Sequence, residues 1–175
     1  MSKKEWFVSV KHMQPSELEY YLEAQAANGY ILKKLGELSP FYYEFEEGKK
    51  TKTKFVVDKT ALAKDMYVDT LTGKGWELMG TVGPFYLWRQ DYTDKRPKDF
   101  TDSEIRGKAC KALSIGALII TLILVLLMFG YGYHLYQIYA FKSAVKIAID
   151  VVGVLIQIPF IWFFFRAYRK YRDAM

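Results

Sequence analysis

The chain has 175 residues, a length that suits either one soluble domain or a small domain with a membrane anchor. Its formal net charge of +6 is unevenly placed, because residues 1–111 carry 19 Lys and Arg against 17 Asp and Glu, whereas residues 112–175 carry 6 against 2. A basic excess at the ends of apolar stretches is typical of membrane proteins and argues against nucleic-acid binding.

Cysteine content and the N-terminus exclude further classes. The single cysteine, Cys110, allows no internal disulfide and no cysteine metal cluster. The first residues lack an apolar core of signal-peptide length, so we expect the front half to stay in the cytoplasm.

The front half begins with a strand at Glu5–Val10, followed by a helix in the stretch PSELEYYLEAQAANG. Ser16 and Glu19 fit a capping box at the helix start, and Asn28-Gly29 fits a left-handed stop at its end. Two further strands are expected at Tyr30–Leu35 and Phe41–Phe45.

The same order then returns. Lys54–Val57 is a predicted strand, Thr60 is the expected N-cap, and Ala61 to about Thr72 is a helix ended by glycine. Trp76–Val82 and Phe85–Gln90 complete the second unit as a pair of strands.

An internal repeat explains this order. Aligning Gly29 with Gly75 places Tyr30 over Trp76, and shortening the second turn by two residues places the two Pro-Phe-Tyr triplets, at 40–42 and 84–86, over each other. Two strand–helix–strand–strand units can join to complete one core. We therefore predict an α+β domain of duplicated units, with a six-stranded antiparallel sheet and two helices, followed by an all-α transmembrane hairpin.

Two later segments have the length and composition to span a bilayer core of roughly 30 Å. The expected divisions are a cytosolic doubled domain at 1–92, a linker and juxtamembrane helix at 93–111, transmembrane helices at 112–133 and 147–166, an external turn at 134–146 and a basic cytosolic tail at 167–175. Lys and Arg gather before the first span and after the second, which predicts that both termini are cytoplasmic. The expected location is thus a cell membrane that the chain crosses twice, with the lipid bilayer as the first partner.

Polar residues interrupt the second span. Asp150 and Gln157 share a helix face, which fits a proton-sensitive or ion-contacting stripe. The alternative places Asp150 at the helix N-terminus near the interface and lets Gln157 bond to the neighbouring helix. Ala112 with Gly116 offers a small face for close packing, which would suit a homodimer.

Four aromatic residues at matched repeat positions are the candidate ligand- or partner-binding set: Tyr30, Tyr42, Trp76 and Tyr86. They would stack on a flat ligand if they lined a cleft between the units. The alternative is that matched aromatics fill matched core pockets.

No catalytic arrangement is recognisable. His12 and His134 lie far apart in the sequence, the GTVGP stretch is a hairpin turn and no phosphate loop, and no nucleophile–base pair has a known spacing. We expect no enzyme activity, no metal and no cofactor.

The stretch LEAQAANGYILKKLG followed by FYYEFEEG, and later GKGWELMG with FYLWR, resembles the DUF2812 family of Gram-positive bacteria. The resemblance covers most of residues 5–90 and the hairpin after them. It implies a protein of the bacterial cytoplasmic membrane, often encoded beside a PadR-type regulator, with a sensing or stress role and no catalytic residues to carry over. By fold analogy alone, the doubled order is similar to gyrase-inhibitor-like domains, which hold small amphipathic ligands between their halves.

Two functions follow as hypotheses. The first is a membrane-anchored cytosolic sensor or adaptor that binds a protein partner or a small amphipathic ligand. The alternative is an accessory or oligomeric component of a membrane transport complex, with hairpins assembled around Asp150 and Gln157.

Overall fold

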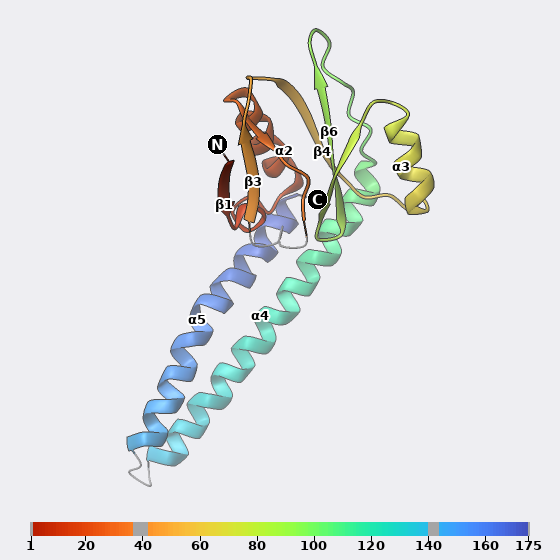
Figure 1. Ribbon diagram of the computed structural model, residues 1–175. Helices are drawn as coiled ribbons and strands as arrows, with labels where there is room; N and C mark the ends of the chain where they lie inside the picture. Colours follow the sequence, from red (N-terminus) through yellow and green to blue (C-terminus); the bar gives the residue numbers. More distant parts are fainter. Residues whose placement is uncertain (1, 37–41, 140–143, 175) are drawn as a thin grey trace. The chain divides into compact units, whose positions relative to one another are not determined.

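A computed structural model describes residues 2–36, 42–139 and 144–174 (Figure 1). The chain divides into two compact units, Met1–Ala109 and Cys110–Asp173, which we call the first and the second unit. An α+β fold forms the first unit, and two long apolar helices packed together form the second.

The first unit contains two successive sets of strand, helix, strand and strand. The first set is β1 (Ser2–Trp6), the short α1 (Val8–Lys11), α2 (Pro15–Ala27), β2 (Tyr30–Leu32) and β3 (Tyr42–Glu47), and the second set is β4 (Lys52–Asp58), α3 (Lys64–Thr72), β5 (Glu77–Val82) and β6 (Phe85–Tyr92). Each set forms a three-stranded antiparallel sheet with its last strand in the middle, in the orders β1-β3-β2 and β4-β6-β5. This shared order confirms the predicted repeat.

Matched glycines mark the same turn in both sets. Gly29 precedes β2 with φ +90°, and Gly75 stands just before β5 with φ +85°. Residues that carry a side chain rarely adopt this left-handed backbone conformation, whereas glycine adopts it at no steric cost. The aligned Gly29 and Gly75 therefore allow the same turn of the backbone, from helix to strand, in each repeat.

The predicted single six-stranded sheet is wrong, because the strands form two separate three-stranded sheets. A backbone hydrogen bond of 2.6 Å from Leu35 N to Met79 O links the segment after β2 to β5. Strand β2 ends at Leu32, and β5 carries an irregularity between Leu78 and Gly80, where a Cβ on Gly80 would meet Leu35 at 2.7 Å. A short strand facing a bulged one offers few aligned groups, so the ladder does not continue between the sheets.

Helix starts also differ from the prediction. Gln14 is the N-cap of α2 and makes no side-chain cap bond, with Pro15 in the first turn, so the Ser16/Glu19 capping box is wrong. Ala63, and not Thr60, is the N-cap of α3, and the Thr60 hydroxyl instead accepts a hydrogen bond from Leu62 N. The first strand is also earlier and shorter than predicted, since α1 begins at Val8.

The sheet β4-β6-β5 is buried on both faces near its middle. Val56 and Trp88 join a core cluster with Tyr67, Leu71 and Trp76, which includes the inner face of α3. The neighbouring residues Phe55, Val57 and Leu87 are also buried, and successive strand residues point to opposite faces. Strand β4 therefore has two covered faces, and the backbone N–H and C=O groups along its outer edge are the ones that still need hydrogen-bond partners.

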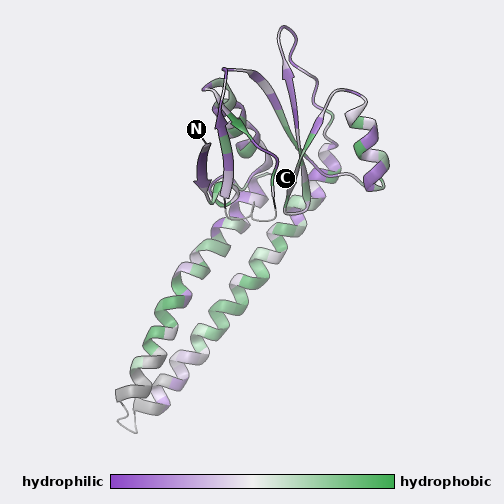
Figure 2. Ribbon diagram, in the orientation of Figure 1, coloured by the Kyte–Doolittle hydropathy of each residue, from purple (hydrophilic) through white to green (hydrophobic). Residues whose placement is uncertain are grey.

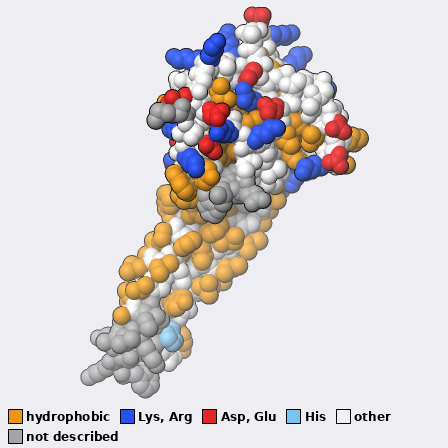
Figure 3. All heavy atoms as spheres, in the orientation of Figure 1, with side chains coloured by type: hydrophobic (Ala, Val, Ile, Leu, Met, Phe, Trp, Pro, Cys, Tyr) orange, Lys and Arg blue, Asp and Glu red, His pale blue; other side chains and the backbone are white. Residues whose placement is uncertain are grey.

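In the second unit, α4 (Ser103–Tyr139, whose first residues belong to the first unit) and α5 (Ala144–Asp173) are mostly hydrophobic (Figure 2). Both contain stretches long and apolar enough to cross a membrane, at Ser103–His134 and Val151–Asp173. On the face drawn in Figure 3, hydrophobic side chains cover these helices and charged ones gather on the first unit.

The helices of the second unit pack through small residues. Ser114, Ala117 and Thr121 of α4 are buried and lie on one helical face, and a Cβ on Gly153 of α5 would meet the Tyr131 ring at 3.5 Å. Small residues let helix backbones approach closely. The expected face of Ala112 and Gly116 is a different one: Ala112 is exposed, and a Cβ on Gly116 would meet nothing within 4 Å.

Candidate functional site

Two glutamates of α2 cover the outer edge of β4. Glu19 Oε1 accepts a hydrogen bond of 2.8 Å from Val57 N, and Glu23 Oε1 accepts one of 3.3 Å from Phe55 N. Four helical residues rise about 6 Å and two strand residues about 6.6 Å, so side chains at this spacing match alternate N–H groups of a strand. The glutamates thus take the place of a neighbouring strand and protect an edge that would otherwise offer free donors.

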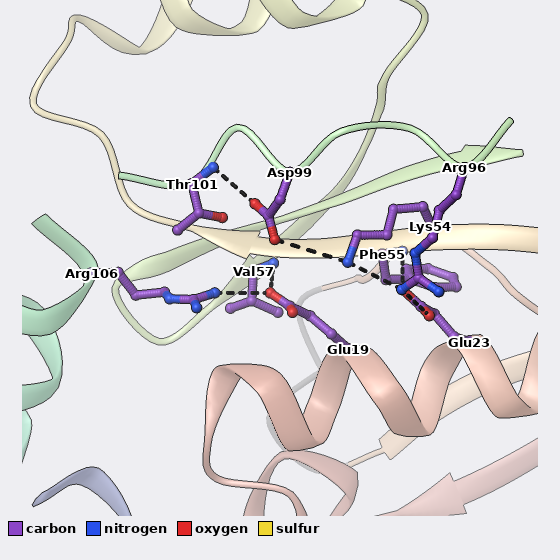
Figure 4. A network of polar contacts seen from close by, with 9 residues as sticks. All are labelled: Glu19, Glu23, Lys54, Phe55, Val57, Arg96, Asp99, Thr101 and Arg106. Atoms are coloured by element: carbon purple, nitrogen blue, oxygen red, sulfur yellow. Dashed lines mark hydrogen bonds and ion pairs between the residues drawn. The ribbon is translucent and has the colours of Figure 1, made fainter. Parts of the chain in front are cut away.

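Three cations converge on the same carboxylates (Figure 4). Arg106, in the first turn of α4, donates to Glu19 Oε1 at 3.2 Å, and Arg96 donates to both oxygens of Glu23 at 2.7 and 3.0 Å. Lys54 of β4 lies 3.5 Å from Glu23 and 3.9 Å from Asp99. Because Glu19, Glu23 and Lys54 are largely buried, the Glu19–Arg106 and Glu23–Lys54 pairs lose much of their water and cannot be treated as surface pairs, whereas the side chain of Arg96 is 55% exposed.

The linker between β6 and α4 is fixed to the first unit at several points. Asp99 accepts a hydrogen bond of 2.9 Å from Thr101 N, and Phe100 meets Trp76 edge to face with ring centroids 4.8 Å apart. Asp102 then caps α4 by accepting hydrogen bonds from Glu104 N and Ile105 N. We define the charged junction as Glu19, Glu23, Lys54, Arg96, Asp99 and Arg106. It joins α2, β4, the linker and the start of α4.

The pKa shifts show which carboxyl group gains least from its partners. Burial raises the pKa of Glu19, and this effect outweighs the Val57 N–H, Arg106 and Lys54, which lower it. Burial also acts on Asp99, but its pKa is lowered because hydrogen bonds from Thr101 and the charges of Lys54 and Arg106 together outweigh it. Of these two carboxyls, Glu19 is therefore the one whose ionised form is disfavoured by its surroundings.

A second buried carboxyl lies at the end of β4. Burial raises the pKa of Asp58, against a hydrogen bond from the Tyr67 hydroxyl. Its other oxygen, Oδ1, is buried and has no hydrogen-bond partner among the described residues. Through Tyr67 this carboxyl contacts the core cluster, and the charges of Arg106 and Asp99 in the charged junction also act on its pKa.

The four candidate aromatics divide between the two sheets. Trp76 is buried in the core cluster, and Tyr86 packs against the same cluster with its ring 5.6 Å from Tyr67. Tyr30 and Tyr42 lie in the other sheet, where Tyr42 contacts Trp6 at 5.3 Å and Tyr30 lies under Lys3 at 4.9 Å. Tyr30 pairs with Glu47 at one end of β3 and Tyr42 stands at the other end, so these two rings lie apart.

In the helical unit, the side chain of Asp150 lies outside what the structure describes, although its backbone belongs to α5. Gln157 is described, and its Oε1 atom is buried without a hydrogen-bond partner in the described part of the chain. Across the described residues, no group of three or more His, Cys, Asp or Glu side chains is arranged to hold a metal ion.

Sequence reasoning missed the charged junction because its members lie up to 87 residues apart in the chain. One local sign exists, since Glu19 and Glu23 each follow a core leucine, Leu18 and Leu22. Acidic residues at the border of an apolar helix face are placed to reach a neighbouring backbone. The capping-box assignment hid this sign by giving Glu19 a local partner.

Comparison with protein families places most of this architecture in one group. Residues 14–123 match the family model described as "Protein of unknown function (DUF2812)", and this range is more than half of the chain. It includes the whole charged junction and the first part of α4. Searches of curated proteins and of solved structures gave no match. The chain belongs to the DUF2812 family.

Proposed function

We propose that this protein is a membrane-anchored sensor or adaptor whose doubled domain binds a protein partner or a small amphipathic ligand. One observation carries the proposal: Arg106, at the start of the helix that becomes the first apolar segment, is held by Glu19 of the doubled domain at 3.2 Å. A state change in α2 or β4 would alter this contact and so reach α4. The doubled domain is then the sensing part, and α4 is the output.

The membrane part of the proposal is supported by helix length and charge. Two apolar helices in series place both chain ends on the same side of a bilayer if both span it. Arg106, Lys108 and Lys111 stand in the first turns of the first helix, before its uncharged run begins at Ala112. The end of the second helix carries four basic residues, Arg166, Arg169, Lys170 and Arg172. The positive-inside rule then puts both termini in the cytoplasm of a bacterial cell. A stress response controlled by a PadR-type regulator is the setting that the family resemblance adds.

In-cell photo-crosslinking of the full chain tests the proposal. The crosslinker is placed at Tyr20 of α2 and, separately, at Met66 of α3, which are both exposed, whereas Trp76 is buried and would report only on the core. Each is compared in the native chain, in Arg106→Gln and in Lys108→Gln. Lys108 is the matched control because it lies on the same helix and forms an exposed pair with Glu104, outside the charged junction.

The expected result is one recurrent protein partner, with its capture changed several-fold by Arg106→Gln and unchanged by Lys108→Gln. Native mass spectrometry of the full chain, released from detergent, covers the case in which the ligand is a small amphipathic molecule. Equal capture of the partner in all three chains would contradict the proposed coupling between the doubled domain and α4. Crosslinks to the chain alone, together with no retained small molecule, would remove the sensor and adaptor reading altogether.

A transport component is the second candidate, and Gln157 favours it. Its buried Oε1 atom lacks a hydrogen-bond partner among the described residues, and a polar group in lipid gains from bonding across helices. A second hairpin would supply such a partner. Under this alternative Asp150→Ala abolishes function while Arg106→Gln leaves it intact, and the opposite pattern favours the sensor.

A further inference from the structure

Two large aromatic side chains stand in solvent at the end of β1. Trp6 is 55% exposed and Phe7 is 49% exposed, and their rings lie 6.3 Å apart. The Trp6 ring also lies 5.3 Å from the ring of the partly buried Tyr42, so Trp6 packs against a residue of the neighbouring strand β3. We call Trp6, Phe7 and Tyr42 the aromatic tip.

The backbone is turned to display this tip. Phe7 has φ +57°, the one non-glycine residue with a positive φ in the described chain. A bulky residue is uncommon in this region, and such conformations persist where the surrounding structure enforces them. The next residue, Val8, is fully buried, so the turn sends Val8 into the core and leaves Phe7 outside.

One lysine borders the aromatic tip: Lys4 lies over the Tyr42 ring at 5.0 Å. Two more lysines are close in sequence, since Lys3 lies over the Tyr30 ring at 4.9 Å, towards the other end of β3, and Lys11 closes the short helix α1. The acidic groups nearby have partners already: Glu5 accepts from Tyr21 and lies 3.5 Å from Lys3, and Glu44 and Glu46 both pair with Lys33. The aromatic tip therefore combines exposed aromatic rings with one lysine, Lys4, at its edge.

We propose that the aromatic tip docks into the headgroup layer of an anionic bilayer. Trp side chains favour the membrane interface, and each Lys near an anionic surface adds to the attraction. A bilayer is the occupant because the same chain carries two helices able to span one, which holds the tip at high effective concentration near lipid. The inference rests on the proposed membrane anchor and adds a second, reversible contact between the doubled domain and the membrane.

Quenching of tryptophan fluorescence by brominated lipid tests the docking of the aromatic tip and the membrane anchor separately. The full chain is reconstituted in phosphatidylcholine vesicles with or without phosphatidylglycerol as the minor lipid. Trp162→Phe leaves Trp6 as the exposed tryptophan, since Trp76 and Trp88 are buried, and Trp6→Phe leaves Trp162, which is 62% exposed on α5. Leu62→Trp, made in a chain that lacks both Trp6 and Trp162, is the matched control because Leu62 is 53% exposed in the other half of the doubled domain.

We expect the fluorescence of the Trp162→Phe chain to be quenched in vesicles that contain phosphatidylglycerol. That quenching should fall by at least half without phosphatidylglycerol, or when Lys3 and Lys4 are also changed to Gln. The Leu62→Trp chain should stay unquenched. Quenching of Trp6→Phe together with none in Trp162→Phe would overturn the docking tip and leave the anchor standing. No quenching in Trp6→Phe would overturn the anchor itself. Equal quenching at positions 6 and 62 would also overturn the tip, because the whole domain would then lie on lipid without a preferred face.

Discussion

At the scale of single residues, Glu19 has two separable roles. Its Oε1 atom accepts from Val57 N, and its charge faces Arg106. Buried ion pairs are often nearly neutral for stability, because desolvation offsets the attraction between the charges. A buried N–H group without an acceptor, in contrast, costs roughly 1–3 kcal/mol. The hydrogen bond, more than the charge, should hold α2 against β4.

We therefore predict that Glu19→Ala lowers the free energy of unfolding by about 1–3 kcal/mol, whereas Glu19→Gln, which keeps an acceptor oxygen, has a small effect. Burial raises the pKa of Glu19 above its ordinary value of 4.5, so the folded state keeps the proton where the unfolded chain has lost it. Native stability then falls, relative to Glu19→Gln, as the pH rises above 4.5 through the folded pKa. Urea unfolding of the full chain in detergent, repeated across this pH range, measures the difference.

Glu104→Gln is the control for this experiment, because Glu104 forms an exposed pair with Lys108 and should change little. Equal losses for Glu19→Ala and Glu19→Gln at neutral pH would contradict the argument. That result would assign the stabilisation to the charge and not to the hydrogen bond.

Residue types alone predict local partners and miss distant ones. Ser16 and Glu19 have the spacing of a capping box, but Pro15 starts α2 and the β4 edge offers Glu19 a buried donor. The tertiary hydrogen bond replaces the local one. Gly29 and Gly75 were predictable for the opposite reason, since their role depends only on backbone conformation.

At the scale of elements, the repeat was predictable because its signals are local: apolar runs, helix stops and turn residues recur in the same order. The division into two sheets was not, because it depends on how the segment after β2 meets β5. Leu35 and Met79 share one backbone hydrogen bond, and the irregularity beside Gly80 interrupts further pairing. Only the folded arrangement shows that the repeats meet without forming a continuous ladder.

The linker is held as an element by Phe100 as well as by charge. Its ring packs edge to face on Trp76 and lies 6.5 Å from Trp88. We predict that Phe100→Ala releases residues 93–102, because the aromatic contact is lost while the exposed Arg96 pair contributes little alone. Limited trypsin digestion of the full chain in detergent should cut after Lys95 and Lys98 at least several-fold faster, whereas Arg96 is followed by Pro97 and is not a trypsin site.

Tyr20→Ala is the matched control for this digestion, because Tyr20 is a largely exposed aromatic on α2. Its cleavage rate should equal that of the native chain. If Phe100→Ala were cut no faster, the ion pairs of the charged junction would be sufficient to hold the linker. The coupling proposed for Arg106 would then not need the aromatic contact.

At the scale of the whole molecule, two different kinds of order meet in one chain. The first unit has mixed charge and two small sheets, and the second has two apolar helices that pack through small residues. Composition predicted this division, since apolar helices of spanning length leave a clear signal in one sequence. It could not predict the contact of Glu19 with Arg106, by which the doubled domain holds the start of α4.

The direction of insertion is the last prediction, and it follows from where Lys and Arg stand. Basic residues gather before the first apolar segment and after the second, while Lys142 and Lys146 are the basic residues between them. In bacterial cells, green fluorescent protein fused after Met175 should fluoresce, and alkaline phosphatase fused after Gln137 should be active, because the first folds only inside the cytoplasm and the second only outside it. Changing Arg166, Arg169, Lys170 and Arg172 to Gln should weaken the retention of the C-terminus in the cytoplasm. Alkaline phosphatase fused after Met175 of this variant should then become more active. Phosphatase activity after Met175 in the native chain would contradict a cytoplasmic C-terminus. A chain with both ends outside would place the charged junction beyond the reach of any cytoplasmic partner, and the sensor proposal would fall with it.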